Sequence, residues 1–540
     1  MPTTRIRAVS ALGVIVALTA FACSSSSKSS STPTTGGSPG ASAAASGATA
    51  PAVVNLGYTA DMQVPDPDIF YEIEGNSVVT SVYEGLVQYA NNSTQIVPAL
   101  ATSWTIAPDG MTYTFHLRPG VTFHDGSGTM TSNDVATSFK RRTALGSVSG
   151  PSYMLADVTS YDTSDPMTFV VHLKDPVTAF MDYLAAPYGP KVEDALGLAA
   201  HAGSDMDQTY LKTHDLGTGP YTMSEFVPGD HYTLTSVPGW WGGKPAITEI
   251  HISILPDVST QQLELQKGQL QMILHGLSKD DVASYENNQK FQVQRFPANF
   301  KTWVMVNPNK GIFKDQALRT ALQSAINKAQ IVTQVYGSDA AVSTQFYPLG
   351  ELPEGMATDN PKYNPALLAK AVSGLSNKKV DLAYSSDDAR NQRDAEIIQT
   401  ELQSAGLNAT VRGIPIAQVF DLPNHKDQAP DLLLSTVNPD ASHPDTWARI
   451  FTNTAGSLNW LQCSVPAADQ EMDLGLHAAT TADVQAHYAK AADLQVAYGC
   501  FDTIADVKDV VVAAAGYSGW YHQPPSLFTV KFGLLKLSGS

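Results

Sequence analysis

The sequence predicts an α/β fold, and three observations support this prediction. Residues 380–384 read as a short apolar strand, residues 395–405 carry apolar side chains at helical spacing, and residues 409–411 begin another strand. A strand, a helix and a strand in this order form a βαβ unit, whose right-handed crossover makes the two strands parallel. Residues 432–437 add a further apolar strand. The 540 residues are enough for two or more domains.

The stretch from residue 96 to residue 141 has the clearest local signals. Apolar side chains occupy every second position of residues 111–117, a period that is typical of a half-buried strand. Thr131 is followed three residues later by Asp134, which resembles a capping box and predicts the start of a helix. We therefore expect a hairpin, a turn, a strand and a capped helix, in that order.

Further elements follow from the same kinds of pattern. Asp315 is a candidate helix cap, apolar residues continue from it at helical spacing, and Gly337 is a stop signal, which predicts a helix over residues 315–337. Residues 217–221 read G-T-G-P-Y and predict an unusual backbone path. We also expect helices at 76–86 and 481–497 and strands at 53–58, 303–307, 509–515 and 528–537.

The charge and the histidines limit the possible functions. The formal net charge is −18, so phosphates would be repelled and neither nucleic acid nor an anionic membrane surface is expected as a partner. Solubility is the simpler explanation of this charge. The 13 histidines show no H-x-x-x-H or H-E-x-x-H spacing, so no metal site and no cofactor is predicted.

The N-terminus has the pattern of an export signal. Two arginines precede an apolar run over residues 8–22, which is short for a membrane span. The run ends in Ala-Phe-Ala before Cys23 and resembles a lipobox, in which a small residue stands before an acylated cysteine. We predict a signal peptide over residues 1–22 and lipidation of Cys23, with an ordinary secretory peptide as the alternative.

The residues after Cys23 predict a tether, and the other cysteines predict a bridge. Residues 23–51 are rich in Ser, Thr, Gly, Pro and Ala and carry one charge, which is typical of a disordered segment. Cys463 and Cys500 are the remaining cysteines. An even pair in an exported protein suggests a disulfide, and two separate buried thiols are the alternative. The lack of a C-x-x-C motif disfavours a zinc ribbon or a thioredoxin-type site.

Several of these motifs together resemble a known family. Residues 98–104 read P-A-L-A-T-S-W, residues 110–126 read G-M-T-Y-T-F-H-L-R-P-G-V-T-F-H-D-G, and T-S-N-D-V begins at Thr131. This order, with G-T-G-P-Y further on, resembles the signature of the peptide/nickel-type extracellular solute-binding family, the binding components of ATP-driven importers. Ser132 stands where Ala is usual, and there is one extra residue between Ser127 and Met130.

The resemblance implies a two-lobed periplasmic-binding-protein-like fold of type II, with an extra subdomain in the first lobe. Lobe one would comprise residues 52–298 and 507–540, with the subdomain inserted at about 96–216, and lobe two would comprise 299–506. The implied function is to capture a small solute, an oligopeptide or dipeptide, in an interlobe cleft and to deliver it to a membrane permease. The protein would be a monomer, exported and held at the outer face of the cell membrane by its lipid.

Two other classes of function are alternatives to transport. A ligand-sensing lipoprotein without transport has the same sequence features. An exported hydrolase has less support, because Gly146-Ser-Val-Ser-Gly150 places Val148 where a G-x-S-x-G motif needs serine. No catalytic residues are predicted, and the chain is not expected to be an enzyme.

The resemblance also points to a ligand anchor. Peptide binders of the family carry G-W-x-x-D-Y-x-D-P after a strand of the second lobe, and the first Asp pairs with the ligand's ammonium group. The matching run is T-V-N-P-D-A-S-H-P over residues 436–444, which places Asp440 on the anchoring Asp and His443 on the second Asp. The alternative is that Asp440 caps a turn.

Aromatic and amide side chains complete the predicted site. Aromatic rings provide large rigid contacts in ligand clefts, although each ring is equally typical of a core. In the family an Asn near the ligand matches Asn459. The candidate cleft residues are Trp303, Trp447, Asn459, Trp460 and Trp520.

Overall fold

The computed structural model describes residues 52–62, 64–146, 151–359, 361–386, 388–526 and 528–537. They form one compact unit, Pro51–Ser540. Within these ranges no helix has the length and apolar character needed to cross a bilayer. The predicted signal peptide, the lipidation site Cys23 and the tether lie outside the described residues.

One large mixed sheet runs through this unit. It has 11 strands in the order β15-β14-β16-β12-β17-β11-β1-β10-β9-β8, with β13 paired to β17. The strands are β1 (Val53–Tyr58), β8 (Tyr221–Val227), β9 (His231–Ser236), β10 (Glu249–Ile254), β11 (Met272–Ile273), β12 (Phe291–Val306), β13 (Ala340–Val342), β14 (Lys379–Ser385), β15 (Asn408–Ile414), β16 (Leu432–Val437) and β17 (Phe501–Ala514).

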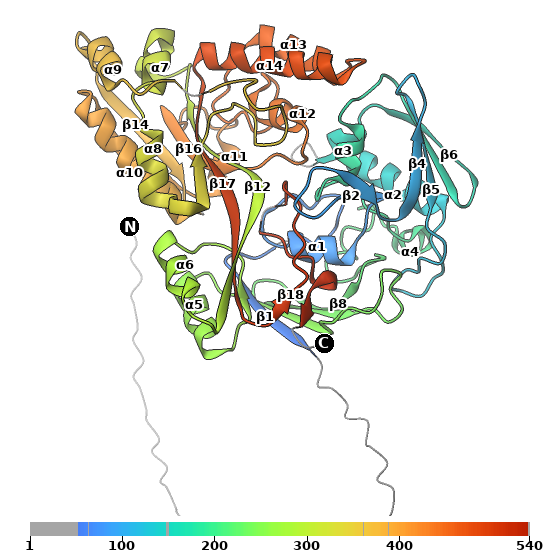
Figure 1. The fold of residues 1–540 in the computed structure, drawn as a ribbon. Helices are drawn as coiled ribbons and strands as arrows, with labels where there is room; N and C mark the ends of the chain where they lie inside the picture. The colour runs from blue at the N-terminus through green and yellow to red at the C-terminus, as the bar shows by residue number, and fades with distance from the viewer. Residues whose placement is uncertain are drawn as a thin grey trace, which may run out of the picture. The chain divides into compact units, whose positions relative to one another are not determined.

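Strands β12 and β17 are the joint between the two ends of the sheet. They have 16 and 14 residues, pair antiparallel, and shift register between Phe296 and Phe300. Figure 1 shows them running the height of the unit, with α5 (Val258–Lys267) and α6 (Lys279–Glu286) near one end. The expected lobe boundaries, at residues 298/299 and 506/507, fall inside these two strands.

The predicted βαβ unit is present. Strand β14, helix α10 (Ala389–Ser404) and strand β15 follow one another, and the two strands pair in parallel from Lys379↔Asn408 to Ser385↔Ile414. The helix packs on the sheet because Ala395, Ile398 and Leu402 share its buried face. The α/β prediction is therefore confirmed.

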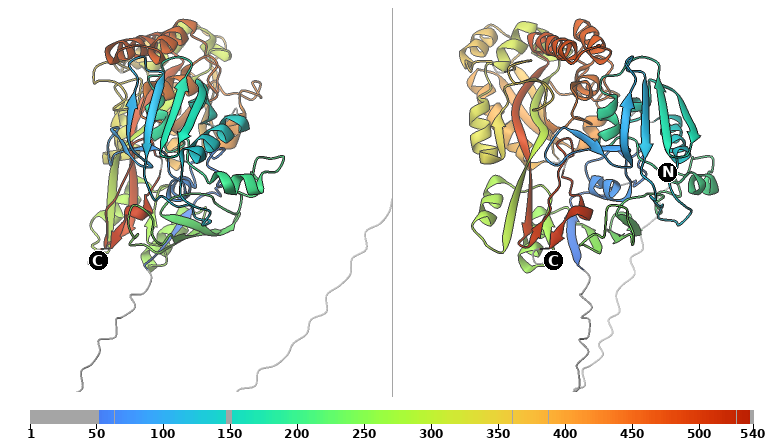
Figure 2. Two further views of the ribbon diagram at one scale, coloured as in Figure 1. Left: turned by 90° about the vertical axis from the view of Figure 1, so that its right-hand side faces the viewer. Right: turned by 45° about the vertical axis from the view of Figure 1, so that its right-hand side comes forward.

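A separate four-stranded sheet forms the predicted subdomain. Its order is β4-β5-β7-β6, from β4 (Ala101–Ile106), β5 (Thr112–Leu117), β6 (Val158–Asp165) and β7 (Thr168–Leu173). In β5 the apolar side chains are buried at alternate positions, as the period of two predicts. Helix α2 (Ser132–Leu145) covers the sheet, and Thr131 and Asp134 form its capping box. Figure 2 shows this sheet apart from the large one.

The remaining strands form two two-stranded sheets, and the remaining elements are helices. The strands are β2 (Val87–Tyr89) with β3 (Ile96–Pro98), and β18 (Tyr517–Ser518) with β19 (Lys536–Leu537). The helices are α1 (Asn76–Val82), α3 (Phe180–Ala185), α4 (Ala195–His201), α7 (Gln316–Gln323), α8 (Lys328–Ile331), α9 (Pro365–Val372), α11 (Ile416–Asp421), α12 (Pro444–Trp447), α13 (Pro466–Leu476) and α14 (Thr481–Tyr498).

Two predicted elements need correction. The helix expected over 315–337 begins at its Asp315 cap, but it breaks after α7, and the side chain of Asn327 caps α8 anew. The strand expected over 528–537 is wrong. Its buried apolar residues lie mostly in a loop that contains the 3₁₀ turn Phe532–Leu534. Within this range only β19 is a strand. The helix expected at 76–86 ends earlier, with α1, because β2 follows it.

The G-T-G-P-Y run is explained by a close approach between backbones. A Cβ on Gly217 would lie 2.1 Å from the carbonyl oxygen of Val82, and one on Gly219 would lie 2.3 Å from that of Ser81. His124 of the signature region fixes the same turn, since its Nε2 lies 2.9 Å from the Gly219 carbonyl oxygen. Glycine is required here by space, and no phosphate-binding role is needed to explain it.

Candidate ligand-binding site

Asp440 is a buried carboxylate held by tyrosines from distant parts of the chain. It follows the C-terminal end of β16 and is 3% exposed. The hydroxyl of Tyr71 donates to both carboxylate oxygens, at 2.8 and 3.0 Å, and the hydroxyl of Tyr153 donates at 2.7 Å. Asp440 therefore connects the loop after β16 to the segment before α1 and to the 3₁₀ helix Pro151–Leu155.

The geometry differs from that of a turn cap. The backbone N–H of Ala441 donates to Thr446 Oγ1 (3.4 Å), and that of Ser442 donates to the hydroxyl of Tyr89 (2.9 Å). A capping aspartate accepts from the backbone N–H two or three residues further on, and the N–H of Ser442, two residues after Asp440, is bonded to Tyr89 instead. The Asp440 carboxylate instead accepts hydrogen bonds from the hydroxyls of Tyr71 and Tyr153.

Burial dominates the electrostatics of Asp440. Loss of water raises the pKa of Asp440 to about 6, and the tyrosine hydroxyls and the positive charge of Arg142 oppose this rise only in part. Arg142 is itself fully buried and donates to the backbone carbonyls of Pro67, Pro151 and Tyr188. An additional cation placed near Asp440 would thus be strongly favoured.

Two more polar contacts tie the segment 440–445 to the first part of the chain. The hydroxyl of Tyr89 accepts from Ser442 and donates to Asp182 Oδ1 at 2.8 Å. In α12, Asp445 accepts from the hydroxyl of Tyr183, which lies on α3. Figure 1 shows α12 facing α3 at the centre of the unit.

His443 and Asp445 are structural parts of this segment. His443 Nδ1 accepts from the Asp445 backbone N–H (3.1 Å) and so caps α12. Burial lowers the pKa of His443 to about 4, which keeps the ring neutral and Nδ1 free to accept. Arg449 donates to both oxygens of Asp445, at 2.8 and 3.1 Å, and neutralises it. The histidine that replaces the family's second Asp therefore has a capping role.

The predicted tryptophans of the second lobe lie in one core. Trp303 and Trp447 have ring centroids 4.6 Å apart, and Phe451 contacts both of them and Trp460. All three indoles are at most 1% exposed. Their packing role is clear, and a ligand contact for Trp303 and Trp460 stays a prediction.

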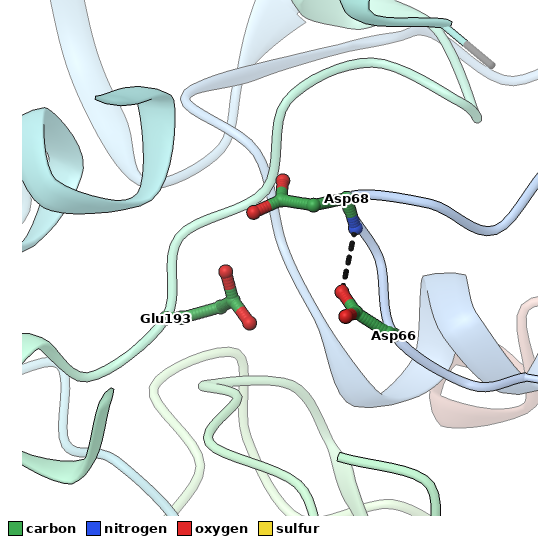
Figure 3. Close-up of side chains that lie close together, drawn as sticks. All are labelled: Asp66, Asp68 and Glu193. Carbon is green, nitrogen blue, oxygen red and sulfur yellow. Dashed lines mark hydrogen bonds between the residues drawn. The ribbon is translucent and has the colours of Figure 1, made fainter. Parts of the chain in front are cut away.

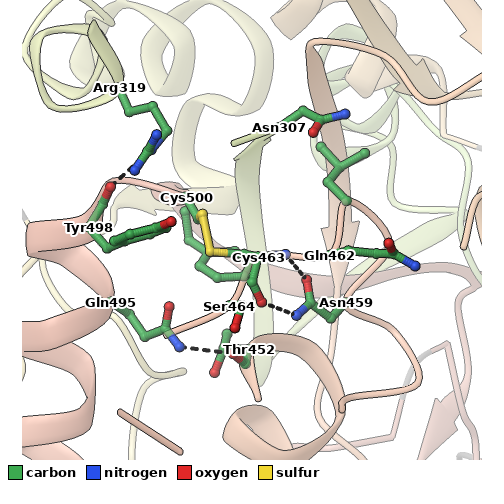
Figure 4. Close-up of a disulfide and its surroundings, with 12 residues drawn as sticks. Asn307, Arg319, Thr452, Asn459, Gln462, Cys463, Ser464, Gln495, Tyr498 and Cys500 are labelled. Carbon is green, nitrogen blue, oxygen red and sulfur yellow. Dashed lines mark hydrogen bonds between the residues drawn. A yellow bond between two sulfur atoms is a disulfide. The ribbon is translucent and has the colours of Figure 1, made fainter. Parts of the chain in front are cut away.

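Asn459 supports the disulfide region, which Figure 4 shows. Its Nδ2 donates to the carbonyl oxygens of Asn453 (3.0 Å) and Cys463 (2.7 Å), and its Oδ1 accepts from the Cys463 N–H (2.9 Å). Cys463 and Cys500 form a disulfide with their Cα atoms 6.2 Å apart. The Asn459 amide is thus occupied by the chain itself, and its contact with a ligand stays a prediction.

Trp520 lies in another part of the molecule. It packs 6.3 Å from Phe296, between ring centroids, beside the register shift of β12, and Asn91 donates to its backbone carbonyl. Its indole Nε1 is buried without a hydrogen-bond partner among the residues described. The structure therefore separates Trp520 from the other predicted tryptophans, and its role in binding stays a prediction.

Three buried carboxylates, shown in Figure 3, form an ion network with arginine. Asp66, Asp68 and Glu193 can bring one oxygen each to within 4.8 Å of the others, a spacing that would suit a metal ion. The guanidinium of Arg141 donates to Asp66 (2.5 and 2.8 Å) and Asp68 (2.9 Å) and lies 3.6 Å from Glu193. Arg141 on α2 therefore supplies the positive charge that these acids face.

A cavity of about 760 Å³ lies elsewhere, against α8, α9 and α10. Tyr363, Arg393 and Glu396 are among its lining residues, and Asp440 is not. The cavity lies between these helices, whereas Asp440 is buried elsewhere in the fold. We take Asp440 as the candidate site because burial raises its pKa, and groups perturbed in this way cluster at functional sites.

The sequence did not reveal the partners of Asp440. Tyr71 and Tyr153 are 369 and 287 residues away from it, and Tyr89 and Tyr183 also belong to the first half of the chain. None of them lies in a motif whose spacing indicates a contact. A match of Asp440 to the family pattern could locate the anchor, but only the fold brings the tyrosines to it.

The two ends of the sheet, the strand joint and the inserted subdomain define a two-lobed binding protein of the periplasmic type. The chain belongs to the bacterial extracellular solute-binding proteins, family 5. The profile of this family's middle region matches residues 95–459, which is more than half of the chain. The predicted family and fold class are confirmed.

Curated relatives and solved structures agree with this assignment. The dipeptide-binding protein of Escherichia coli (strain K12) is 25% identical over 359 residues, which cover 61% of this chain and 65% of that protein. The matched part thus spans less than two thirds of that relative. DppA of Helicobacter pylori, solved with the peptide STSA, has a TM-score of 0.79 at 21% identity, covering 90% of this chain and 98% of that one. NikZ of Campylobacter jejuni, solved with Ni(L-His), has a TM-score of 0.78 at 19% identity, covering 90% and 99%.

Proposed function

We propose that this protein captures a dipeptide or oligopeptide between its lobes and delivers it to the permease of an ATP-driven importer. The observation that carries the proposal is Asp440, a buried carboxylate that lies between the two parts of the chain and has no paired cation within salt-bridge distance among the described residues. The ammonium group of a peptide is a cation of the right kind. Relatives named as dipeptide-binding and a solved neighbour with a bound peptide support this ligand class.

At the proposed anchor, the ligand ammonium would lose its bound water and pair with the charge of the Asp440 carboxylate. A ligand ammonium that docks on Asp440 would form charge-assisted hydrogen bonds in a site with little water. The hydroxyls of Tyr71 and Tyr153 would continue to orient the carboxylate. Because the same segment, residues 440–445, contacts Tyr89 and Tyr183, ligand binding there would also favour the closed arrangement of the lobes.

The domain assignment is part of the proposal. Lobe one would comprise residues 52–298 and 507–540 with the subdomain at about 96–216, and lobe two would comprise 299–506. The register shift of β12 and β17 between Phe296 and Phe300 supports a hinge there, since irregular pairing is easier to bend than a regular ladder.

The cellular setting of the proposal rests on the N-terminal sequence and the family. A signal peptide over residues 1–22, a lipid on Cys23 and a tether over 23–51 would hold a monomer at the outer face of the cell membrane, near its permease. A sensor without transport would use the same ligand site. The family is one of solute-binding proteins, and a hydrolytic activity has no motif to support it.

Two measurements test the ligand class and the anchor. Mass spectrometry of compounds that co-purify with the soluble protein should find peptides with a free N-terminus. Calorimetry with such a peptide should then show that Asp440→Asn weakens binding by about a hundredfold or more, since stranding one member of a buried ion pair costs about 3–5 kcal/mol.

The matched control for this measurement is Asp427→Asn, an exposed acid of the same lobe, which should bind as the wild type does. Equal affinity of the Asp440→Asn and wild-type proteins would remove Asp440 as the anchor. Failure of free-amine peptides to bind at all would remove peptides as the ligand class.

A further inference from the structure

A second buried acidic group lies near the proposed anchor. Glu351 belongs to a loop after β13 and is 8% exposed. Both of its carboxylate oxygens are buried, and among the described residues neither has a partner at full hydrogen-bond geometry, although the Asn299 amide interacts with the carboxylate. A buried, unpartnered carboxylate is costly, so its presence needs an explanation.

Glu351 is close to an acid of the subdomain. Burial raises the pKa of Glu351 well above its ordinary range, and the negative charge of Asp182 adds to this rise. Burial also raises the pKa of Asp182 to about 7, although the Tyr89 hydroxyl donates to it. The charge of Glu351 in turn contributes to the raised pKa of Tyr89. The Tyr89 hydroxyl bonds Asp182, and Glu351 acts electrostatically on both, so we call Glu351, Asp182 and Tyr89 the Glu351 cluster.

The nearby cations are already paired. Lys301, whose charge acts on Glu351, donates to Asp506 (2.5 Å), Ser343 Oγ (2.6 Å) and the Gln345 carbonyl oxygen (3.0 Å). This lysine and the neighbouring Asn299 amide lower the pKa of Glu351, but they do not cancel the effect of burial. Within the described part of the chain, no salt bridge reaches Glu351 or Asp182.

The Glu351 cluster and the proposed anchor share one loop. The Tyr89 hydroxyl accepts from the backbone N–H of Ser442 (2.9 Å), and Asn299 Nδ2 donates to Ser442 Oγ (3.3 Å). Ser442 is two residues after Asp440. The loop of Glu351 also reaches the first lobe, since a Cβ on Gly350 would lie 3.8 Å from Thr94 Cγ2. The cluster therefore spans the same interface as Asp440, on the Ser442 side.

We propose that Glu351 and Asp182 bind a second cationic group of the ligand, so that the preferred substrates are peptides with a basic side chain in addition to their ammonium group. The inference rests on the proposed peptide-binding function. A lysine or arginine side chain would neutralise two carboxylates that the protein leaves without a counter-ion. Burial favours the protonated forms of the two acids, and a bound basic side chain would favour ionisation, so that binding would release protons to the solvent.

The test uses matched peptides that differ in one charge. Tripeptides with a free N-terminus, alanine at two positions and either lysine or methionine at the third are titrated into the full mature protein by calorimetry. For at least one of the three positions, the lysine peptide should bind about ten times more tightly than its methionine partner, as expected for a hydrogen bond to a charged group. Glu351→Gln should reduce this ratio to about one, and Glu354→Gln, an exposed acid three residues further on, should preserve it.

Proton release gives a second readout. Lysine peptides should release protons at pH 6–7, measured as a dependence of the binding enthalpy on the buffer, and methionine peptides should release fewer. Asp182→Asn should reduce this release, which keeps the inference testable even if Glu351→Gln fails to fold.

The outcomes separate the two proposals. If methionine and lysine peptides bind equally well, or if Glu351→Gln leaves the ratio unchanged, the second cationic subsite is wrong while peptide binding stands. If no peptide of either kind binds, the peptide-binding function fails and this inference fails with it.

Discussion

Replacing Asp440 by asparagine should stabilise the unliganded protein at neutral pH, although it should remove the proposed ligand anchor. The change keeps the shape of the side chain and removes a charge that burial disfavours. Burial raises the pKa of Asp440 from 3.8 to about 6, a shift of about two units, which corresponds to about 3 kcal/mol of folding free energy that the ionised group costs at pH 7.5.

The sign of the pH dependence follows from the direction of this shift. The folded protein holds the proton more tightly than the unfolded chain, so the ionised carboxylate destabilises the fold as the pH rises from about 4 to about 6, and the cost is constant above that range. The advantage of Asp440→Asn should therefore be about 3 kcal/mol at pH 7.5 and about 1 kcal/mol at pH 4.5.

Urea unfolding at these two pH values, with ligand removed, measures the difference in the free energy of unfolding between wild type and variant. Asp427→Asn, an exposed change in the same lobe, should shift neither midpoint. An Asp440→Asn protein that is less stable than wild type at pH 7.5 would refute the reasoning, because it would mean that the charge is stabilised by its surroundings. Equal stability at both pH values would indicate a simple turn cap, which asparagine also provides.

Three further predictions follow from other parts of the chain. Tyr153→Phe removes a donor to the ionised Asp440 and should lower the free energy of unfolding by about 1.5–3 kcal/mol at pH 7.5 and by less at pH 4.5. Urea unfolding measures this loss, and Tyr363→Phe, at 46% exposure, is the control that should have no effect. Reduction of Cys463–Cys500, which closes a loop with a sequence separation of 37, should lower stability by about 4 kcal/mol in the chain-entropy description, and two free thiols titrated in the denatured, unreduced protein would contradict the bridge. Cys23→Ser should release the protein into the medium or leave it unprocessed, and a wild-type protein without an acyl mass on its N-terminal cysteine would exclude the lipid anchor.

Elements with a strong local signal could be predicted from the sequence. The bounds of β1 and β16 agree with the apolar runs that predicted them, and the capping box of Thr131 begins α2 as expected. In these segments the periodicity, the cap and the tertiary packing favour the same conformation, so a local reading is sufficient.

Elements that depend on distant partners could not be predicted in the same way. Residues 291–302 vary in polarity, and they extend β12 only because β17 pairs with them across most of its length. The break after α7 depends on Asn327, whose side chain caps the next helix while its backbone N–H donates to Glu401 on α10. The periodic pattern alone is compatible with one continuous helix, and the distant carboxylate gives no local signal.

The site shows the same division between local and distant information. Asp440 could be found by position, because it follows an apolar strand and matches a family pattern. Its electrostatic state could not, because burial in the fold raises its pKa, and the tyrosines whose hydroxyls oppose this rise, Tyr71 and Tyr153, lie far away in the sequence. Glu351 is the stronger example, since it has no motif and is distinguished only by burial without a partner.

The contacts of residues 440–445 suggest how binding and closure are coupled. Asp440, Ser442 and Asp445 each accept from or donate to a tyrosine hydroxyl of the proposed first lobe, whereas the proposed connection between the lobes runs through β12 and β17. If the lobes open at this joint, all three contacts break together and Asp440 regains water, which lowers the cost of its charge. A ligand cation removes that cost in the closed form, so closure is favoured most when the ligand is present. In this proposal the segment 440–445 both anchors the ligand and holds the lobes together, so a substitution at Asp440 should change affinity and stability in opposite directions.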